Sequence, residues 1–228
     1  MKVCVVVNAN ESDTGLLDES LSGFSEIVML ERENSSGWRN VDGADLFVHL
    51  GSSWSVYWRT VSGPVGAEVA LMRHATKRGV PVLGICFGAQ VLSHSFGGIV
   101  ERAKKAEIGW CDVNASTDDS VLAGRWMQWH YDSFTAPDGF EVLAINEAGV
   151  QAIRRGRSLG VQFHPEATVP MVSKWAGGDG ASELAALGIS PADLLEQTRL
   201  ETLKSVGATR RLTHWFLEDV AQGPVPGN

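Results

Sequence analysis

The sequence has few cysteines and no long apolar run, and both shortages limit what the protein can be. Only three cysteines occur among 228 residues, at positions 4, 86 and 111, and their spacing shows no pairing. A disulfide framework is therefore not expected, and the predicted compartment is the reducing cytoplasm. No apolar stretch approaches the ~20 residues that a membrane-spanning helix needs. The apolar run at 3–7 is too short for the core of a signal peptide, so none is expected.

Positive charge and metal-binding patterns are also scarce. Acidic residues outnumber basic ones by 27 to 19, which gives a net charge of −8. An acidic chain binds nucleic acid and anionic membranes poorly, so neither is an expected partner. The six histidines and three cysteines show no close ligand spacing, so no metal is predicted. No glycine pattern typical of a phosphate-binding loop occurs, and no cofactor is predicted.

The first hundred residues alternate between short apolar runs and helical patterns. Four runs lack polar alternation, which is typical of strands buried on both faces: 3–7, 26–30, 45–50 and 80–85. Helices are predicted over 64–78 and 88–96, each followed by glycine. This alternation predicts an α/β fold with parallel strands at the centre of its sheet.

The middle and the end of the chain have different patterns. Five short strand-like runs follow one another between turn sequences: 109–114, 126–130, 141–146, 150–154 and 159–163. They predict antiparallel strands added beside the parallel core. Further on, a Ser-Pro-Ala-Asp start predicts a helix from 190 to about 218. One domain is predicted over 1–222, with a flexible glycine-rich link at 177–180 and a frayed tail at 223–228.

One cysteine occupies a position where chemistry is expected. The segment GICFGAQ at 84–90 joins a predicted strand to a predicted helix. Its glycines allow a sharp turn, which aims the Cys86 side chain above the carboxyl edge of the sheet. A thiol there also lies at a helix N-terminus, whose dipole favours an anion. From this segment alone, Cys86 fits a small buried hydrophobic residue equally well.

A histidine at the end of a later strand supplies a base. The segment QFHPE at 162–166 places His164 at that strand end and Glu166 two residues further on. A cysteine nucleophile needs a base, and the base needs a third group that orients it. Alone, His164 fits a structural histidine with a hydrogen bond. Together with Cys86 and Glu166, it completes a nucleophile, a base and an orienting carboxylate.

The two segments resemble the signature motifs of class I, triad-type glutamine amidotransferases. GICFGAQ and QFHPE occur in the order of that family, and the resemblance runs over most of the chain. Between them, EIGW at 107–110 and WMQWHYD at 126–132 are similar to the family's intervening segments, most of all to those of the glutaminase part of GMP synthase. The resemblance implies a doubly wound, flavodoxin-like, mostly parallel sheet with helices on both faces.

The resemblance also implies roles for single residues. Cys86 would attack the γ-carboxamide of glutamine, His164 would act as base and acid, and Glu166 would orient His164. Gln90 would contact the bound substrate. The segment His130, Tyr131 and Asp132 would line the substrate pocket, although a structural role in a strand and turn suits it equally.

One segment departs from the family pattern. Where the family commonly carries Gly-Gly-Pro, this chain has Gly51, Ser52 and Ser53. Because a backbone N–H survives any substitution except proline, an oxyanion hole is predicted from the N–H groups of Phe87 and Ser52, with Gly51 beside them. A side chain at position 52 can narrow the glutamine pocket. Two tryptophans at 54 and 58 are expected beside this segment, as pocket walls or as a partner surface.

Three functions therefore stay open. The first is a glutaminase that supplies ammonia to a separate synthetase subunit, since these residues leave no room for a synthetase domain. The second is a stand-alone γ-glutamyl peptidase or hydrolase that uses the same triad. The third is a non-catalytic regulatory or binding module, against which the complete triad argues.

Overall fold

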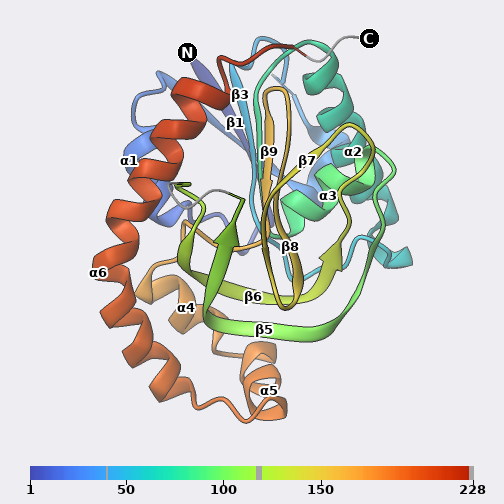
Figure 1. Cartoon of the computed structure of the whole chain (residues 1–228). Helices are drawn as coiled ribbons and strands as arrows, with labels where there is room; N and C mark the ends of the chain where they lie inside the picture. The colour runs from blue at the N-terminus through green and yellow to red at the C-terminus, as the bar shows by residue number, and fades with distance from the viewer. Residues whose placement is uncertain (40, 117–119, 226–228) are drawn as a thin grey trace.

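The centre of the sheet is parallel in the computed structural model, which describes residues 1–39, 41–116 and 120–225 (Figure 1). Five strands lie there in the order β2-β1-β3-β4-β9. Their bounds are Glu26–Glu31, Lys2–Val7, Leu46–His49, Val82–Ile85 and Ser158–Val161. Every residue of β3, β4 and β9 is buried, because both faces of the sheet are covered. This burial explains why these strands lack polar alternation in the sequence.

Antiparallel strands extend the sheet beyond β9, in the order β8-β7-β5-β6. Their bounds are Gly149–Arg155, Glu141–Asn146, Val100–Ala115 and Gly124–Phe134. The predicted antiparallel addition is confirmed for four of its five runs. The fifth run, at 159–163, instead gives β9, which pairs in parallel with β4 and antiparallel with β8, so it closes the parallel core. β5 and β6 are longer than predicted. The added first half of β5 is mostly polar and exposed or half-buried, with a register shift between Arg102 and Glu107, whereas β6 continues through the buried Asp132 and Phe134. Figure 1 shows this pair as a long curved ribbon at the lower side of the sheet.

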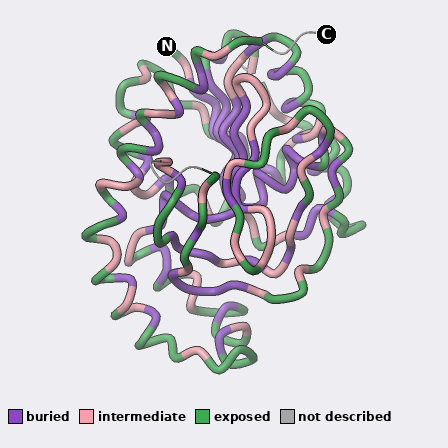
Figure 2. Tube along the Cα trace, in the orientation of Figure 1, coloured by how far each residue is buried: buried purple, intermediate pink, exposed green. Residues whose placement is uncertain are grey.

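Helices cover both faces of the parallel strands, as the doubly wound prediction requires. One face packs against α2 and α3, which span Ser62–Lys77 and Phe87–Ser95. The other face packs against α1, a short helix at Asp18–Leu21, and against the long α6 at Pro191–Trp215. Short helical turns complete the chain at Gly15–Leu17, Arg32–Gly37, Arg59–Val61 and Phe216–Val220. Figure 2 shows the buried residues along the central strands and exposed residues along the outer side of α6.

The segment between β9 and α6 differs from the prediction at its glycines. α4 spans Val169–Trp175 and α5 spans Asp179–Ala186, so half of the predicted link at 177–180 belongs to a helix. Gly180 is buried, and a Cβ there would overlap the carbonyl oxygen of Trp175. The glycine therefore serves close helix packing and not a loose connection. The last three residues of the predicted tail, 226–228, lie outside the described residues.

The start of α6 confirms its predicted signals. The Ser190 hydroxyl accepts a hydrogen bond from the N–H of Asp193, and Pro191 occupies the first helical position. The helix ends at Trp215 and passes into a π-helical turn that reaches Val220. No helix in the described ranges has both the length and the apolar character needed to cross a bilayer.

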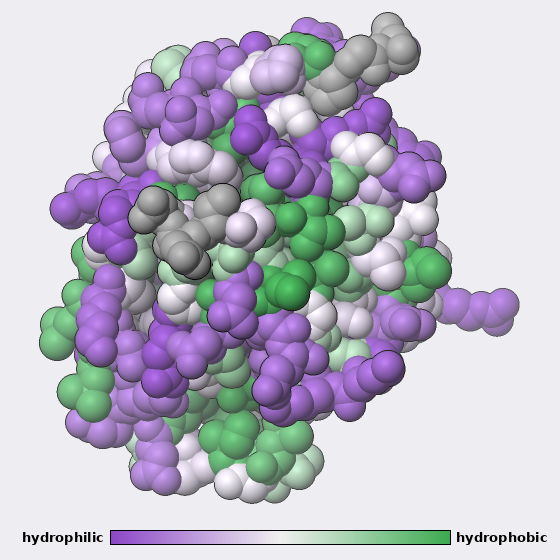
Figure 3. Space-filling view, viewed as in Figure 1, coloured by the Kyte–Doolittle hydropathy of each residue, from purple (hydrophilic) through white to green (hydrophobic). Residues whose placement is uncertain are grey.

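Apolar side chains also reach the surface, and one group of them lies over the antiparallel strands. Figure 3 shows them gathered at the centre of the face that Figure 1 presents, over β7 and β8, with hydrophilic residues around them. Val142 and Ile145 of β7 are among the exposed apolar residues. This region lies on the antiparallel extension of the sheet and not on the edge that carries the predicted nucleophile.

Candidate active site

Cys86 stands at a sharp turn between β4 and α3. Its backbone has φ 50° and ψ −108°, and among the described residues no other non-glycine residue has a positive φ. A Cβ at Gly84 would lie 2.6 Å from the carbonyl oxygen of Gly88, and one at Gly88 would overlap the carbonyl oxygen of His49. Both glycines are thus required by close backbone approach. The strained backbone at Cys86 costs about 1–3 kcal/mol, an arrangement that is concentrated at functional sites.

His164 and Glu166 form a tight buried pair after the end of β9. The Nδ1 of His164 donates to Oε1 of Glu166 over 2.6 Å. The backbone N–H of His164 donates to the carbonyl of Met127 in β6, which holds the segment against the antiparallel strands. His164 Nε2 and Glu166 Oε2 are buried and have no hydrogen-bond partner among the described residues. The free Nε2 leaves one ring nitrogen available for proton transfer.

The charge state of His164 follows from its surroundings. Burial alone would lower the pKa of His164, because a charged imidazole is costly away from water. The negative charges of Glu166 and of Cys86 outweigh burial and raise the pKa well above its usual value. The site therefore favours an imidazolium beside the sulfur of Cys86.

The sulfur of Cys86 has a polar neighbour that sequence reasoning missed. Gln162 Nε2 lies 3.5 Å from Sγ, within donating distance, and Gln162 is buried. Gln90, predicted to contact the substrate, lines the cavity and donates its Nε2 to Oε1 of Gln162 over 3.2 Å. The signal for Gln162 was present, because it stands two residues before His164 in the QFHPE segment that follows β9.

The predicted oxyanion segment lies directly beside the pair. A Cβ at Gly51 would lie 2.8 Å from Cε1 of His164 and 3.6 Å from Cβ of Cys86. Among the described residues, the backbone N–H groups of Gly51, Ser52 and Phe87 donate to no protein group. The Phe87 N–H is free because it begins α3. Three unpaired N–H groups near one thiol are suited to binding a negative oxygen.

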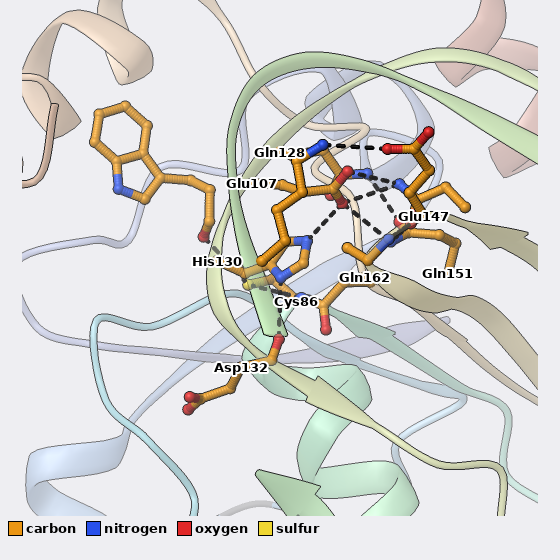
Figure 4. Close-up of polar contacts among 12 residues, drawn as sticks. Cys86, Glu107, Gln128, His130, Asp132, Glu147, Gln151 and Gln162 are labelled. Atoms are coloured by element: carbon orange, nitrogen blue, oxygen red, sulfur yellow. Dashed lines mark hydrogen bonds and ion pairs between the residues drawn. The ribbon is translucent and has the colours of Figure 1, made fainter. Parts of the chain in front are cut away.

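The three predicted pocket residues, His130, Tyr131 and Asp132, all line the cavity. His130 is buried, and its ring nitrogens lie 3.0 Å from the Asp132 carbonyl oxygen and 3.2 Å from the Glu107 carboxylate. Figure 4 shows Glu107 between His130 and Gln151, with the Asp132 side chain turned away from this group. The Asp132 carboxylate accepts from the Tyr57 hydroxyl over 2.8 Å. His130 therefore supports the strand through these contacts while it also lines the cavity.

Tyr131 and the tryptophans shape the entrance. The Arg102 guanidinium lies 4.2 Å from the centre of the Tyr131 ring. The two tryptophans, expected as pocket walls or as a partner surface, are placed differently. Trp54 packs edge-on against Phe87, whereas Trp58 is 45% exposed. Both tryptophans line the cavity.

One cavity of about 560 Å³ unites these residues. It is lined by Cys86 and His164, by the predicted oxyanion segment and by the strand residues 129–132. Charged residues also line it: Glu11, Asp13, Arg102, Lys174, Asp179 and Glu183. Such a volume holds a small-molecule ligand. Among the described residues, no group of three or more histidine, cysteine or acidic side chains is placed to hold a metal ion.

Comparison with known proteins identifies relatives. Residues 59–171 match the family model described as glutamine amidotransferase class-I, a segment that includes Cys86, His164 and Glu166. The GMP synthase [glutamine-hydrolyzing] of Aquifex aeolicus is 38% identical over 105 residues, a match that covers 42% of this chain and 21% of that protein. The match thus spans about a fifth of the length of this curated relative.

Two solved structures resemble the whole chain. A glutamine amidotransferase from Thermotoga maritima superposes with a TM-score of 0.83 at 26% identity, covering 96% of this chain and 99% of that one. A glutamine amido transferase from Methylobacillus flagellatus superposes with a TM-score of 0.80 over 99% of this chain and 96% of that one. At 20% identity the second likeness shows the fold alone.

Proposed function

The chain belongs to the class I glutamine amidotransferases, and on this basis we propose that it hydrolyses the γ-amide of glutamine to glutamate and ammonia. One arrangement supports the proposal above all. Cys86 and His164 line the same cavity, and Glu166 holds the imidazole over 2.6 Å with its second nitrogen free. A nucleophile, a proton carrier and an orienting carboxylate are the parts that acyl transfer through a cysteine requires.

The first half of the reaction forms a thioester. The Cys86 thiolate attacks the γ-carbonyl carbon of glutamine, and the carbonyl oxygen gains the negative charge. The N–H groups of Phe87 and Ser52 bind this oxyanion, a contribution of about 3–4 kcal/mol for each donor in such sites. As the tetrahedral intermediate collapses, the C–N bond breaks and the His164 imidazolium gives its proton to the departing ammonia. The raised pKa of His164 suits this proton donation.

The second half releases glutamate. His164, now neutral, takes a proton from a water molecule, and the resulting hydroxide attacks the thioester carbonyl. The same N–H groups bind the second oxyanion. The C–S bond breaks, glutamate leaves, and the thiolate and the imidazolium are restored.

The ammonia requires a use, and we propose that a separate synthetase subunit receives it and transfers it to an acceptor molecule. The curated relatives are named as glutamine-hydrolysing GMP synthases, and this chain matches only about a fifth of the one compared above. We place the protein in the cytoplasm, because its three cysteines are unpaired and a catalytic thiol must stay reduced.

A second candidate is hydrolysis of γ-glutamyl peptides or related γ-glutamyl amides by the same triad. The observation in its favour is the extent of the cavity. From Cys86 it continues to Trp58, Arg102 and Lys174, which leaves space for a group attached to the γ-amide nitrogen. This reading uses the same chemistry and changes only the leaving amine.

A substrate panel tests the proposal. Wild type is expected to release ammonia from free glutamine, and Cys86→Ala is expected to release none, because the nucleophile is absent. Folding of the variant is checked by circular dichroism. Cys111→Ala, which removes a half-buried thiol outside the cavity, is the matched control and keeps its activity.

Two results would change the conclusion. Strong turnover of γ-glutamyl dipeptides with little turnover of free glutamine would favour the second candidate. Failure of 6-diazo-5-oxonorleucine to label Cys86, together with no turnover of either substrate, would indicate a non-catalytic module.

A further inference from the structure

Arg32 lies next to the candidate active site and is completely buried. It directly follows β2, and its side chain is 0% exposed. Two of its five N–H donors, on Nε and Nη2, bind the Glu68 carboxylate over 2.8 and 3.1 Å. Buried arginines are rare unless paired, and this bidentate pair fixes the plane of the guanidinium.

The other three donors hold backbone and side-chain oxygens at the edge of the sheet. Nη1 donates to Oδ1 of Asn8 over 2.8 Å and to the Gly51 carbonyl over 3.0 Å. Nη2 donates to the Leu50 carbonyl over 2.7 Å. All five donors are therefore used, and Arg32 has none left for a substrate.

The two carbonyls belong to the peptide groups that carry the predicted oxyanion donors. The peptide between Gly51 and Ser52 is planar and trans, so its C=O and N–H point in opposite directions. When Arg32 binds the Gly51 carbonyl, it turns the Ser52 N–H away from itself. The same geometry applies to the Leu50 carbonyl and the Gly51 N–H. Arg32 thus sets the direction of two N–H groups that have no other partner among the described residues.

Arg32 also touches the residue that carries the third N–H. Its guanidinium carbon lies 5.0 Å from the centre of the Phe87 ring, within the range of a cation–π contact. Phe87 is buried and follows the nucleophile in sequence. One side chain therefore contacts both walls of the predicted oxyanion hole.

We propose that Arg32 is a positioning residue for the oxyanion hole, held by Glu68 and acting through the Gly51–Ser52 peptide and Phe87. This inference rests on the proposed function. It extends that function to a residue in neither motif, in the turn that follows β2, which sets the geometry of the hole without touching the substrate.

The charges of this group favour positioning over direct electrostatic help. Burial would raise the pKa of Glu68, but Arg32 and His49 outweigh it and lower the pKa to about 2. Glu68 is therefore ionised at neutral pH and balances Arg32. Burial lowers the pKa of His49, which donates from Nδ1 to Glu68, so His49 is neutral. The Arg32–Glu68 pair therefore carries no net charge that would act on an oxyanion. What it supplies is the orientation of the backbone N–H groups.

The test is Arg32→Lys, which keeps the positive charge but replaces the planar five-donor fork with a single ammonium. Loss of one oxyanion donor lowers kcat by about a hundredfold or more in such sites. We expect a fall of about that size in kcat, with KM unchanged, on whichever γ-glutamyl substrate wild type hydrolyses. The affinity for the γ-aldehyde analogue of glutamine, which forms a tetrahedral adduct with the cysteine, should fall in parallel. The rate of Cys86 alkylation by iodoacetamide should not change, because that reaction forms no oxyanion.

Arg157→Lys is the matched control. Arg157 also binds two backbone carbonyls, those of Gly79 and Gly223, away from the cavity. It should lose stability without losing aldehyde affinity. If Arg32→Lys does not fold, Glu68→Gln is the second variant. It removes the negative charge and one of the two oxygens that hold Arg32, and it should show the same selective loss of aldehyde affinity.

Two outcomes would overturn the inference. One is a folded Arg32→Lys protein with wild-type kcat and aldehyde affinity. The other is equal loss of aldehyde affinity and alkylation, which would mean general damage to the nucleophile. Both presuppose an active wild type, whereas a wild type that hydrolyses no γ-glutamyl compound contradicts the proposed function itself.

Discussion

At the scale of single residues, the site depends on opposing effects on one imidazole. Burial favours neutral His164, while the carboxylate of Glu166 and the sulfur of Cys86 favour the imidazolium, and the net result is a raised pKa. Because the pKa is raised on folding, His164 stabilises the folded protein most below its ordinary value. That contribution is lost as pH rises through the folded-state pKa. The imidazolium is also the form that can protonate ammonia.

Replacing Glu166 with Gln is expected to shift the high-pH decline of kcat/KM to lower pH. Without the carboxylate, the pKa of His164 falls, so the imidazolium is lost at a lower pH and kcat/KM declines earlier as pH rises. Loss of orientation also lowers kcat, by about a hundredfold or more. The pH profile of ammonia release measures both effects.

Glu183→Gln is the control for this shift. Glu183 lines the same cavity but binds Trp129 Nε1 and not the histidine. In Glu183→Gln, the decline of kcat/KM at high pH should match that of wild type. An unshifted decline in Glu166→Gln would mean that Glu166 does not set the charge of His164.

At the scale of elements, the junction of β4 and α3 determines where the sulfur lies. The chain can turn there because glycines at 84 and 88 let the strand, the helix and the end of β3 approach backbone to backbone. The helix start then leaves the Phe87 N–H unpaired next to the thiol. The segment 84–88 thus provides both the close backbone packing and the groups proposed for the chemistry.

Gly88→Ala should be strongly destabilising and nearly inactive. The added Cβ overlaps the His49 carbonyl oxygen, so α3 must shift away from β3, and the oxyanion donors separate. We expect a loss of about 2–4 kcal/mol in unfolding free energy, as for other severe steric changes in a core. Urea unfolding and ammonia release measure the two effects.

Gly66→Ala in α2 is the matched substitution. A Cβ there meets no atom within 4 Å, so alanine should stabilise the helix by about 0.5–1 kcal/mol and leave turnover unchanged. Equal behaviour of the two alanine variants would contradict the close-approach explanation of the turn.

At the scale of the whole molecule, the site is held from the far end of the chain. α6 lies along one face of the sheet (Figure 1), and the Thr209 hydroxyl donates to the Pro165 carbonyl over 2.6 Å, between His164 and Glu166. The N–H of Leu16 donates to the Glu166 carbonyl. Segments about 190 residues apart in the sequence thus hold one loop.

Thr209→Val tests this long-range support. Valine keeps the shape but leaves the buried Pro165 carbonyl unpaired, which costs about 1–3 kcal/mol. Thermal unfolding should show the loss of stability, and kcat should fall because the His164–Glu166 loop is less well held. Thr202→Val, whose hydroxyl donates only within its own helix, should change neither kcat nor the pH profile. Equal kcat in both variants would mean that α6 does not support the loop.

Local patterns could be interpreted from the sequence because their causes are close in the chain. The α/β alternation, the antiparallel addition, the N-cap at Ser190 and the turn at Cys86 each depend on residues within a few positions of one another. The helix at 179 was missed because Gly180 is required by packing against Trp175, a contact that glycine content alone cannot distinguish from a flexible link.

What the sequence by itself determined was the alternation of strands and helices, apart from the short helices α1 and α5, and the identity of the three residues proposed for the chemistry. Only the tertiary structure decided which other side chains serve them. Arg32 is a charged residue in a polar stretch, which suggests solvent exposure, yet it is buried. Its five acceptors come from the ends of β1 and β3, the loop after β3 and α2. Parallel strands bring these segments to one edge of the sheet, and no local sequence pattern predicts that they come together.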